Sequence, residues 1–273
     1  MHDIYIISLN TDGSTFPIQK IGLSNVNPLT YVFLRFLIAT IFSFLLFKKG
    51  NFLYSFILGL VLSIGYITQI VGIKFTTATK AGFITSQYII LIPLFAYIID
   101  REKINKYQGA GFVFSIIGSY FLSGGIYGFN FGDLLMLICA ISFALHIVLI
   151  TKFSKKINEK DLLTYQFLTV TIISFLTSII FKVPMNINIF SFITIVYSAF
   201  IGSIVVIYLQ LKHQKNIGSN LTAILFLAQP IFSAILSLLL LNETFTTKQI
   251  FGAIILLFGI VVANLNKKNI FQN

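Results

Sequence analysis

The sequence predicts an all-α integral membrane protein built from two inverted repeats, and three observations support that prediction. Hydrophobic residues make up 57% of the chain and charged residues only 10%, whereas soluble domains carry about 25% charged residues. Apolar runs of about 20 residues recur along the chain, long enough to cross a hydrocarbon core of about 30 Å as helices. Part of the first half also matches the second half at a constant shift of 141 residues.

The matching stretch begins at Gln69 and ends at Gly118. Shared Leu and Ile could arise in any two apolar segments, but polar and glycine positions are scarce in this chain and still coincide. The coinciding pairs are Gln69 with Gln210, Lys74 with Lys215, Glu102 with Glu243, Gln108 with Gln249, Gly111 with Gly252 and Gly118 with Gly259. We interpret them as an internal duplication, which in a membrane protein is typical of transporters.

The N-terminal part is the least regular. Residues 1–12 contain one apolar run, residues 4–9, which is too short to span a bilayer and lacks the pattern of a signal peptide. Residues 13–23 form a weakly amphipathic piece, and Asn25, Asn27 and Pro28 indicate a turn.

Nine spans follow, at residues 29–47, 52–73, 76–99, 106–122, 131–150, 162–181, 189–211, 219–241 and 247–265. A Gly-rich turn at 123–128 separates four spans from five, so one helix is expected to be missing or damaged at the N-terminus. This predicts one membrane domain, with a first repeat at residues 1–123 that is incomplete at its N-terminus and a second repeat at residues 129–266.

Lysine and arginine residues in the loops predict the orientation. Alternate loops and the C-terminal tail hold 13 of the 19, the opposite loops hold 5, and Arg35 lies inside a span. The positive-inside rule places the richer side and the C-terminus in the cytoplasm, as in a multi-pass protein of the plasma or inner membrane. The Glu102 loop then faces the cytoplasm and the Glu243 loop faces outward, so the copies are inverted. Scattered lysines explain the net charge of +11 without a nucleic acid partner.

Short motifs mark the start of the chain and the ending of each half. The start carries residues 13–20, Asn27-Pro28 and residues 35–39. The endings carry Gln229-Pro230, Asn242-Glu243, Gly252 and Gly259 in the second half, and Glu102, Gly111 and Gly118 in the first. Together they resemble EamA-type members of the drug/metabolite transporter superfamily. The resemblance implies ten helices in two inverted five-helix repeats around a central cavity that works by alternating access.

The resemblance also implies an aromatic residue, often Trp, directly before Gly13 at the end of a long apolar run. Asp12 stands at that position, and no such run precedes it. We therefore expect about nine intact helices of the family's ten, with the first helix truncated or damaged by a misplaced start, a truncation or a frameshift.

Arg35 is the first candidate for a substrate cavity. An Arg inside a span costs at least about 2.5 kcal/mol unless it snorkels or finds a partner. Since no Asp or Glu lies deep in any span, carbonyls, Gln side chains or an anionic substrate are its expected partners. A structural or gating role, a place on the substrate path and snorkelling to the outer interface all stay open.

Glutamines and tyrosines are further candidates. Gln69 and Gln210 are repeat partners; Tyr66 shares a helix face with Gln69, and Tyr208 lies close to Gln210. Buried amides and phenols need hydrogen-bond partners, which either a hydrated cavity or bonds between helices would supply.

Gln87, Tyr88 and Gln229 lie in matched spans, and Pro93 and Pro230 are expected to interrupt those spans. Broken helices at corresponding places in two halves indicate a transport site or a hinge. Proline kinks that serve packing alone are the alternative.

The remaining candidates have simpler interpretations. His146 could relay a proton or form a hydrogen bond between helices. Glu102 and Glu243 each precede a new helix, where an acid favours the helix N-terminus, so we expect them to act as caps. The repeated glycines are expected to allow close helix packing: Gly111, Gly118, Gly252 and Gly259.

The sequence therefore favours a secondary transporter or exporter of small metabolites, such as amino acids or amphipathic compounds. An inactive or structural remnant is the alternative, because the first helix is expected to be damaged. A membrane-embedded enzyme is less favoured, since the sequence lacks a His-Glu-x-x-His zinc motif, an intramembrane aspartyl dyad and a Walker motif. We expect no cofactor and no metal, and a packing role for Cys139. The oligomeric state is not predicted.

Overall fold

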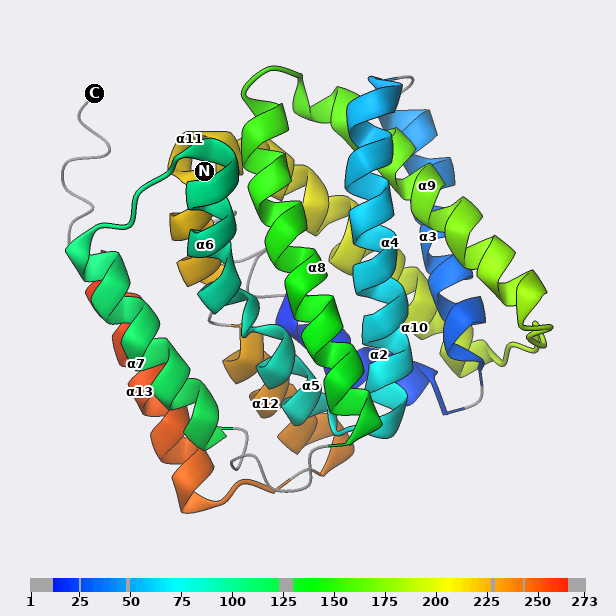
Figure 1. Cartoon of the computed structure of the whole chain (residues 1–273). Helices are drawn as coiled ribbons and strands as arrows, with labels where there is room; N and C mark the ends of the chain where they lie inside the picture. The colour runs from blue at the N-terminus through cyan, green and yellow to red at the C-terminus, as the bar shows by residue number, and fades with distance from the viewer. Residues whose placement is uncertain are drawn as a thin grey trace.

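The chain folds into a bundle of helices (Figure 1). The computed structural model describes residues 12–24, 26–47, 50–122, 130–226, 229–242 and 244–264, and within them every regular element is helical. The damaged first helix expected at residues 1–12 therefore falls almost wholly outside the described residues, as does Glu243.

The first half contains the 3₁₀ turn η1 (Asp12–Ser14) and helices α2 (Thr15–Gly22), α3 (Pro28–Phe47), α4 (Phe52–Phe75), α5 (Ala78–Thr85), α6 (Tyr88–Asp100) and α7 (Lys106–Leu122). The second half contains α8 (Phe131–Ser154), α9 (Glu159–Ile180), α10 (Ile189–Ala199), the π-helical turn η2 (Phe200–Val205), α11 (Val206–Phe226), α12 (Gln229–Leu241) and α13 (Thr247–Asn264).

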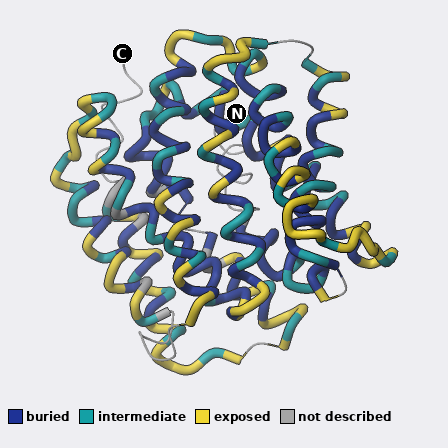
Figure 2. The backbone as a smooth tube through the Cα atoms, turned by 45° about the vertical axis from the view of Figure 1, so that its right-hand side comes forward, coloured by how far each residue is buried: buried dark blue, intermediate teal, exposed yellow. Residues whose placement is uncertain are grey.

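The surface of the bundle is largely apolar, whereas much of its interior is polar. Five helical stretches are long and apolar enough to cross a membrane: α3, α4, α8, α9 and Ile189–Ala223, which runs through α10, η2 and most of α11. Large apolar side chains such as Leu45, Ile180 and Leu239 are exposed, while many Ser, Thr and Gln side chains are buried. Figure 2 shows the exposed positions on the outside of the bundle. A lipid bilayer is the environment that suits so much exposed apolar surface.

Two predicted spans each contain two helical pieces. Residues 76–99 form α5 and α6, and the described residues within 219–241 form the last part of α11 and then α12. The pieces match at the shift of 141: 78–85 matches 219–226, and 88–100 matches 229–241. Gly218, whose φ is +80°, interrupts α11 directly before the piece 219–226. The helical pieces of the two halves therefore correspond.

The break in the first half does not fall at Pro93, contrary to the expectation from the sequence. α6 continues through Pro93, and Pro230 is the second residue of α12. Proline is tolerated in the first turn of a helix because the N–H that it lacks has no intrahelical partner there. In the first half the interruption lies at Ser86 and Gln87, well before Pro93.

The helix α2 is buried, whereas the sequence predicted a weakly amphipathic piece. It packs against α4, α5, α10 and α12. Two polar side chains in and beside it have partners inside the bundle: the hydroxyl of Ser14 in η1 lies 2.8 Å from the Tyr197 hydroxyl, and Lys20 Nζ of α2 donates to the Ile73 carbonyl at 2.7 Å. Polarity in this segment therefore reflects interior contacts rather than contact with water.

The helices α7 and α13 lie side by side and antiparallel at one edge of the bundle (Figure 1). A Cβ at Gly118 would lie 2.7 Å from the Gly252 carbonyl oxygen, and a Cβ at Gly259 would lie 3.0 Å from the Gly111 carbonyl oxygen. Replacing each residue by its repeat equivalent converts one contact into the other, as in a two-fold symmetric interface. Glycine permits this close approach because it has no side chain to separate the helices.

These two helices also begin in the same way. The Gln108 N–H donates to Asn105 Oδ1 at 2.8 Å, and the Asn105 N–H donates to Gln108 Oε1 at 3.0 Å. Thr246 and Gln249 form the equivalent reciprocal bonds at 2.8 and 3.4 Å. Such capping boxes satisfy N–H groups that a helix leaves free at its start. The repeated glutamines Gln108 and Gln249 thus act as helix caps.

Candidate functional site

A cavity of about 40 Å³ lies where the two broken spans meet α4, α8 and α11. A buried water needs about 10–15 Å³, so this volume suits on the order of three waters. Six of the nine cavity candidates from the sequence line it: Tyr66 and Gln69 of α4, Tyr88 of α6, His146 of α8, Gln210 of α11 and Gln229 of α12. The fold thus gathers residues from five helices around one space.

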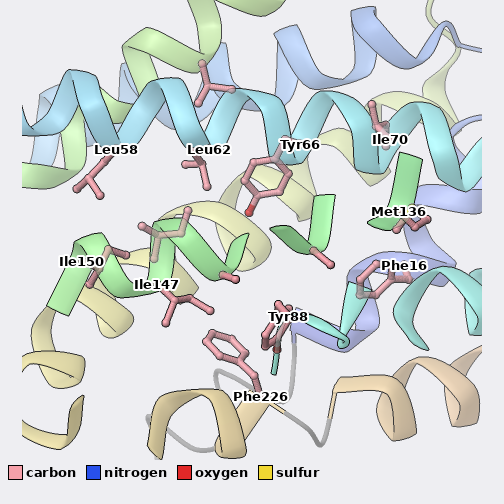
Figure 3. Packing of buried hydrophobic residues seen from close by; sticks show 14 of the residues in the cluster. Phe16, Leu58, Leu62, Tyr66, Ile70, Tyr88, Met136, Ile147, Ile150 and Phe226 are labelled. Carbon is pink, nitrogen blue, oxygen red and sulfur yellow. The ribbon is translucent and has the colours of Figure 1, made fainter. Parts of the chain in front are cut away.

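Apolar and aromatic side chains form the rest of the wall. Phe16 of α2 and Phe226 of α11 are among them. The rings of Tyr88 and Phe226 meet edge-on with their centres 6.0 Å apart. Figure 3 shows Tyr66 projecting from α4 toward the side where Tyr88 and Phe226 lie. A few polar groups among aromatic walls are typical of sites for small organic molecules.

Tyr88 and Gln229 join the two halves directly. The Tyr88 hydroxyl donates to Gln229 Oε1 at 3.1 Å, and both side chains are buried. Tyr88 is the first residue of α6 and Gln229 is the first described residue of α12. The contact therefore joins equivalent positions of the two halves at the cavity.

The repeated glutamines Gln69 and Gln210 both face the cavity but differ in their partners. Within the described part of the chain the Gln69 side chain makes no hydrogen bond, although it is only 3% exposed. Gln210 Nε2 donates to Gln214 Oε1 at 2.8 Å. A buried amide without a protein partner requires water or a solute, so Gln69 can act as both donor and acceptor toward a ligand.

His146 lines the cavity and also contacts a neighbouring helix. Its imidazole lines the cavity, and its Nε2 lies 3.1 Å from Gln166 Oε1 on α9. With that oxygen as acceptor, Nε2 carries the proton and Nδ1 is the acceptor nitrogen of the neutral ring. His146 is therefore a cavity residue that also links two helices.

Arg35 lies behind the cavity wall. Only 1% of it is exposed, so it does not snorkel to the membrane interface. Its Nε donates to Ser203 Oγ at 2.9 Å and its Nη2 to the Gly202 carbonyl at 2.8 Å, both within the π-helical turn η2. The guanidinium carbon lies 4.4 Å from the centre of the Tyr66 ring, and the Tyr66 hydroxyl donates to the same Gly202 carbonyl at 3.3 Å. Single π-helical turns are frequent at functional sites.

Known proteins share both this fold and the sequence pattern. The pattern of the EamA-like transporter family matches residues 5–124 and 130–265. The chain belongs to the EamA-like transporter family. As a member it is a multi-pass helical membrane transporter with a repeated fold, which confirms the fold class and the family resemblance expected from the sequence.

Several EamA-like relatives carry only the description of uncharacterized transporters. One from Archaeoglobus fulgidus is 35% identical over 254 residues, which is 93% of this chain and 82% of the relative. YyaM of Bacillus subtilis is 24% identical over 286 residues, covering 96% and 93% of the two chains. A crystal structure with a TM-score of 0.74 and 17% identity covers 94% of this chain and 98% of its own, and supports the fold alone.

Three of the nine candidates lie outside the cavity of this EamA-like transporter. Arg35 is separated from it by Tyr66. Gln87 is half-buried, and its Nε2 donates to the Phe83 carbonyl at 3.3 Å. Tyr208 stacks on Phe47 with ring centres 5.0 Å apart.

A chain of hydrogen bonds leads from the cavity toward one end of the bundle. Gln210 donates to Gln214, whose Nε2 donates to Thr151 Oγ1 at 2.7 Å. The hydroxyl of Ser219 also donates to Thr151 Oγ1 at 2.7 Å. All four side chains are buried, so these bonds join α8 and α11 in a region closed to water.

Glu102 completes the closure at this end. Its carboxylate accepts the backbone N–H groups of Ser219 and Asn220 at 3.0 Å each. Gly218 makes room for it, because a Cβ on Gly218 would lie 2.8 Å from Glu102 Oε1. Glu102 thus caps a helix, as its capping interpretation requires, but that helix belongs to the second half and is not the α7 that follows Glu102. Its repeat equivalent, Glu243, lies outside the described residues.

Charged residues close the opposite end. Lys80 Nζ pairs with Asp133 Oδ2 at 2.5 Å, and Asp133 is fully buried. Thr76 Oγ1 donates to Asp133 Oδ1 at 2.8 Å, while Lys20 Nζ bonds to the carbonyls of Ile73 and Thr76 at the end of α4. These contacts tie α2, α4, α5 and α8 together.

The sequence did not single out Thr85, Gln214 or Asp133 as site residues. Thr85 lines the cavity and Gln214 extends the polar chain, but each stands among other polar residues, so nothing in the local sequence distinguishes it. Asp133 did carry a local sequence signal, because Asn130 and Asp133 have the spacing of the capping box that they form at the start of α8.

Proposed function

We propose that this EamA-like protein is a secondary transporter that moves small metabolites by alternating access through the cavity. The Tyr88–Gln229 contact is the observation that supports this most strongly, because it joins equivalent positions of the two halves at one polar space. Transporters built from repeats form their solute sites where broken helices of the two halves meet. Repeats at residues 1–123 and 129–266 are the units that move against each other.

Polar contacts join the helices toward each end of the bundle, and we assign them as the two closures. Glu102, Ser219 and Thr151 close one end, and Lys80 with Asp133 closes the other. Because the cavity of about 40 Å³ suits only a few waters, a metabolite enters only when one closure opens. Opening the two ends in alternation moves the solute without ever forming a continuous pore.

The wall chemistry favours solutes with both polar and apolar parts. The amides of Gln69, Gln210 and Gln229 offer donors and acceptors, and the aromatic rings offer apolar contact. Amino acids and small amphipathic compounds combine these properties.

Transport by the reconstituted protein is the direct test. Purified protein in proteoliposomes is assayed with a panel of labelled amino acids and amphipathic compounds. Gln69→Ala and Gln229→Ala are expected to abolish transport because both side chains line the cavity. Gln87→Ala is the matched control, since Gln87 lies outside the cavity, and it is expected to keep wild-type rates. Rates equal to those of empty liposomes for every solute would favour the inactive remnant instead.

We place the Glu102 end of the bundle and the C-terminus on the cytoplasmic side of the cell membrane, because the loops and tail on that side hold 13 of the 19 Lys and Arg residues. Lys156 and Lys182 are exposed at opposite ends, and the native Cys139 is buried. Lys182→Cys is expected to react with a membrane-impermeant maleimide in intact cells, and Lys156→Cys only after permeabilisation. The reverse pattern would invert the topology.

A further inference from the structure

Arg35 carries a buried positive charge without a counter-ion. Among the described Lys, Arg, Asp and Glu side chains, only Arg35 and Asp133 are buried, at 1% and 0% exposure. Asp133 is neutralised by Lys80. Arg35 bonds to a carbonyl and a hydroxyl, and no described carboxylate pairs with it. A buried charge in this situation favours the arrival of an anion.

The guanidinium also keeps unused hydrogen-bonding capacity. It has five N–H donors, and Ser203 and Gly202 each accept one of them. Nη1 makes no hydrogen bond within the described residues. The planar fork of an Arg side chain matches a carboxylate, which can accept two parallel N–H bonds from it.

One side chain, Tyr66, separates this charge from the cavity. Its ring covers the guanidinium at 4.4 Å, and the same ring forms part of the cavity wall. The Tyr66 hydroxyl lies 3.3 Å from the Gly202 carbonyl oxygen, longer than the usual O–H···O range of about 2.5–3.0 Å. Rotation of Tyr66 away from Gly202 would join the Arg35 site to the cavity.

A second buried group without partners lies on the helix face that covers this site. Gln19 is 0% exposed, and neither its side-chain oxygen nor its nitrogen has a partner within the described residues. Thr15, Gln19 and Gly22 share one face of α2. Thr15 Cγ2 would lie 2.7 Å from a Cβ on Gly202, and a Cβ on Gly22 would lie 2.7 Å from the Tyr31 ring. This face therefore packs over η2 and the first turns of α3, which carries Arg35.

We propose that Arg35 binds the carboxylate, or another compact anionic group, of the transported solute, and that Gln19 makes the second polar contact. This inference rests on the proposed transport function and identifies its substrate class as organic anions, including zwitterions. The anion takes N–H donors that the guanidinium leaves unused, while its Nε and Nη2 stay bonded to the π-helical turn between α10 and α11. Binding at Arg35 is thereby coupled to the shape of that span.

Ligand-dependent thermal stability of the detergent-purified full chain tests the proposal. The probes are two pairs of similar shape in which a neutral amide replaces the carboxylate, acetate with acetamide and phenylacetate with phenylacetamide, at equal ionic strength set with sodium chloride. A ligand that binds only the folded state raises the unfolding midpoint. We expect at least one acid to raise the wild-type midpoint and its amide to leave it unchanged. Equal shifts for acid and amide, or no shift with either acid, would overturn the proposal.

Variants of Arg35 and Gln19 test whether the acid binds at the proposed site. Arg35→Gln is expected to weaken the apparent affinity for the acid about tenfold or more, and Arg35→Lys to retain part of it. Lys74→Gln, which removes an exposed charge at the end of α4, is the matched control and is expected to keep the full shift. If Arg35→Gln does not fold, Gln19→Leu replaces it, because it keeps the charge and removes the second contact. An undiminished acid shift in whichever of these two variants is used would overturn the proposal.

The outcomes for binding and for transport are separate. An Arg35-dependent shift in a protein that moves no solute in proteoliposomes refutes the transport function and leaves the anion site intact. Transport of amides and amines at the same rate as the matched acids, insensitive to Arg35→Gln (or to Gln19→Leu where Arg35→Gln does not fold), refutes the anion site and leaves transport intact.

Discussion

The Tyr88 hydroxyl donates to the side-chain oxygen of Gln229 at 3.1 Å, across 141 residues of sequence. Because 141 is also the shift that relates the two halves, each of these residues is the repeat equivalent of the other. Residues that meet their own equivalents lie beside the pseudo-two-fold axis of a symmetric pair. Any movement of one half against the other therefore changes this contact.

Removing this hydrogen bond is expected to affect transport more than stability. Bonds between membrane helices average about 0.6 kcal/mol, so Tyr88→Phe is expected to lower the free energy of unfolding by less than about 1 kcal/mol. The transport rate is expected to fall roughly 2- to 30-fold, the range for residues that couple moving elements. A cycle of Tyr88→Phe, Gln229→Leu and the double variant in proteoliposomes measures the coupling, and strictly additive effects would show that the two residues act independently.

Gly218→Ala is expected to destabilise the fold strongly. Gly218 has φ +80° and ψ 170°, a conformation essentially restricted to glycine, and the added methyl would lie 2.8 Å from Glu102 Oε1. The free energy of unfolding is expected to fall by about 1–3 kcal/mol from backbone strain alone. Gly109→Ala in α7 is the control, since no atom lies within 4 Å of its added methyl, and it is expected to be neutral or slightly stabilising. Equal effects of the two substitutions in reversible unfolding would contradict the strain argument.

The Lys80–Asp133 ion pair predicts that replacing Lys80 alone costs more stability than replacing both residues. Lys80→Met leaves the Asp133 carboxylate buried without its cation, which costs up to about 3–5 kcal/mol, reduced here because Lys80 is partly exposed. Lys80→Met with Asp133→Asn is expected to recover much of that loss, because it removes the unpaired charge and keeps a side chain that can cap α8. Thermal unfolding of both variants at one pH gives the comparison. A double variant no more stable than Lys80→Met would show that the ion pair is not the main contribution.

The packing of α7 on α13 predicts that alanine substitutions at its glycines cost more stability where the helices lie closer together. A Cβ at Gly118 would approach the Leu256 backbone nitrogen to 2.5 Å, whereas the nearest atoms to a Cβ at Gly259 lie at 3.0 Å. Overpacking a tight contact costs about 1–3 kcal/mol, so Gly118→Ala is expected to be near the top of that range and Gly259→Ala near the bottom. Chemical denaturation of the detergent-solubilised protein measures both, and a larger effect at Gly259 would show that the closeness of the helix contact does not set the cost.

The chemistry of the cavity was predictable to a large extent, but its geometry was not. Glutamine and tyrosine residues are conspicuous in apolar runs, and the repeat pairs Gln69 with Gln210, so residue type and spacing pointed to most of the lining. Tyr208 shows the limit of this reasoning. It lies two residues before Gln210 but points to Phe47 instead, because successive residues on a helix face different directions.

Glu102 shows the same limit of reasoning from the sequence. The sequence indicated that Glu102 caps a helix, yet the N–H groups that it accepts belong to Ser219 and Asn220, more than a hundred residues away. Local dipole arguments predict that an acid favours a helix N-terminus, but they do not select which N-terminus lies nearest.

The sequence by itself determined the membrane class, the duplication and the family, because composition, run length and a repeated polar frame are local properties of the chain. Only the tertiary structure decided where the matched spans break, which helix Glu102 caps and which groups satisfy Arg35. Those features depend on contacts between segments far apart in the chain, such as Arg35 with Gly202 and Tyr88 with Gln229. A buried polar group takes its partner from whichever helix packs against it, and that packing is a property of the whole bundle.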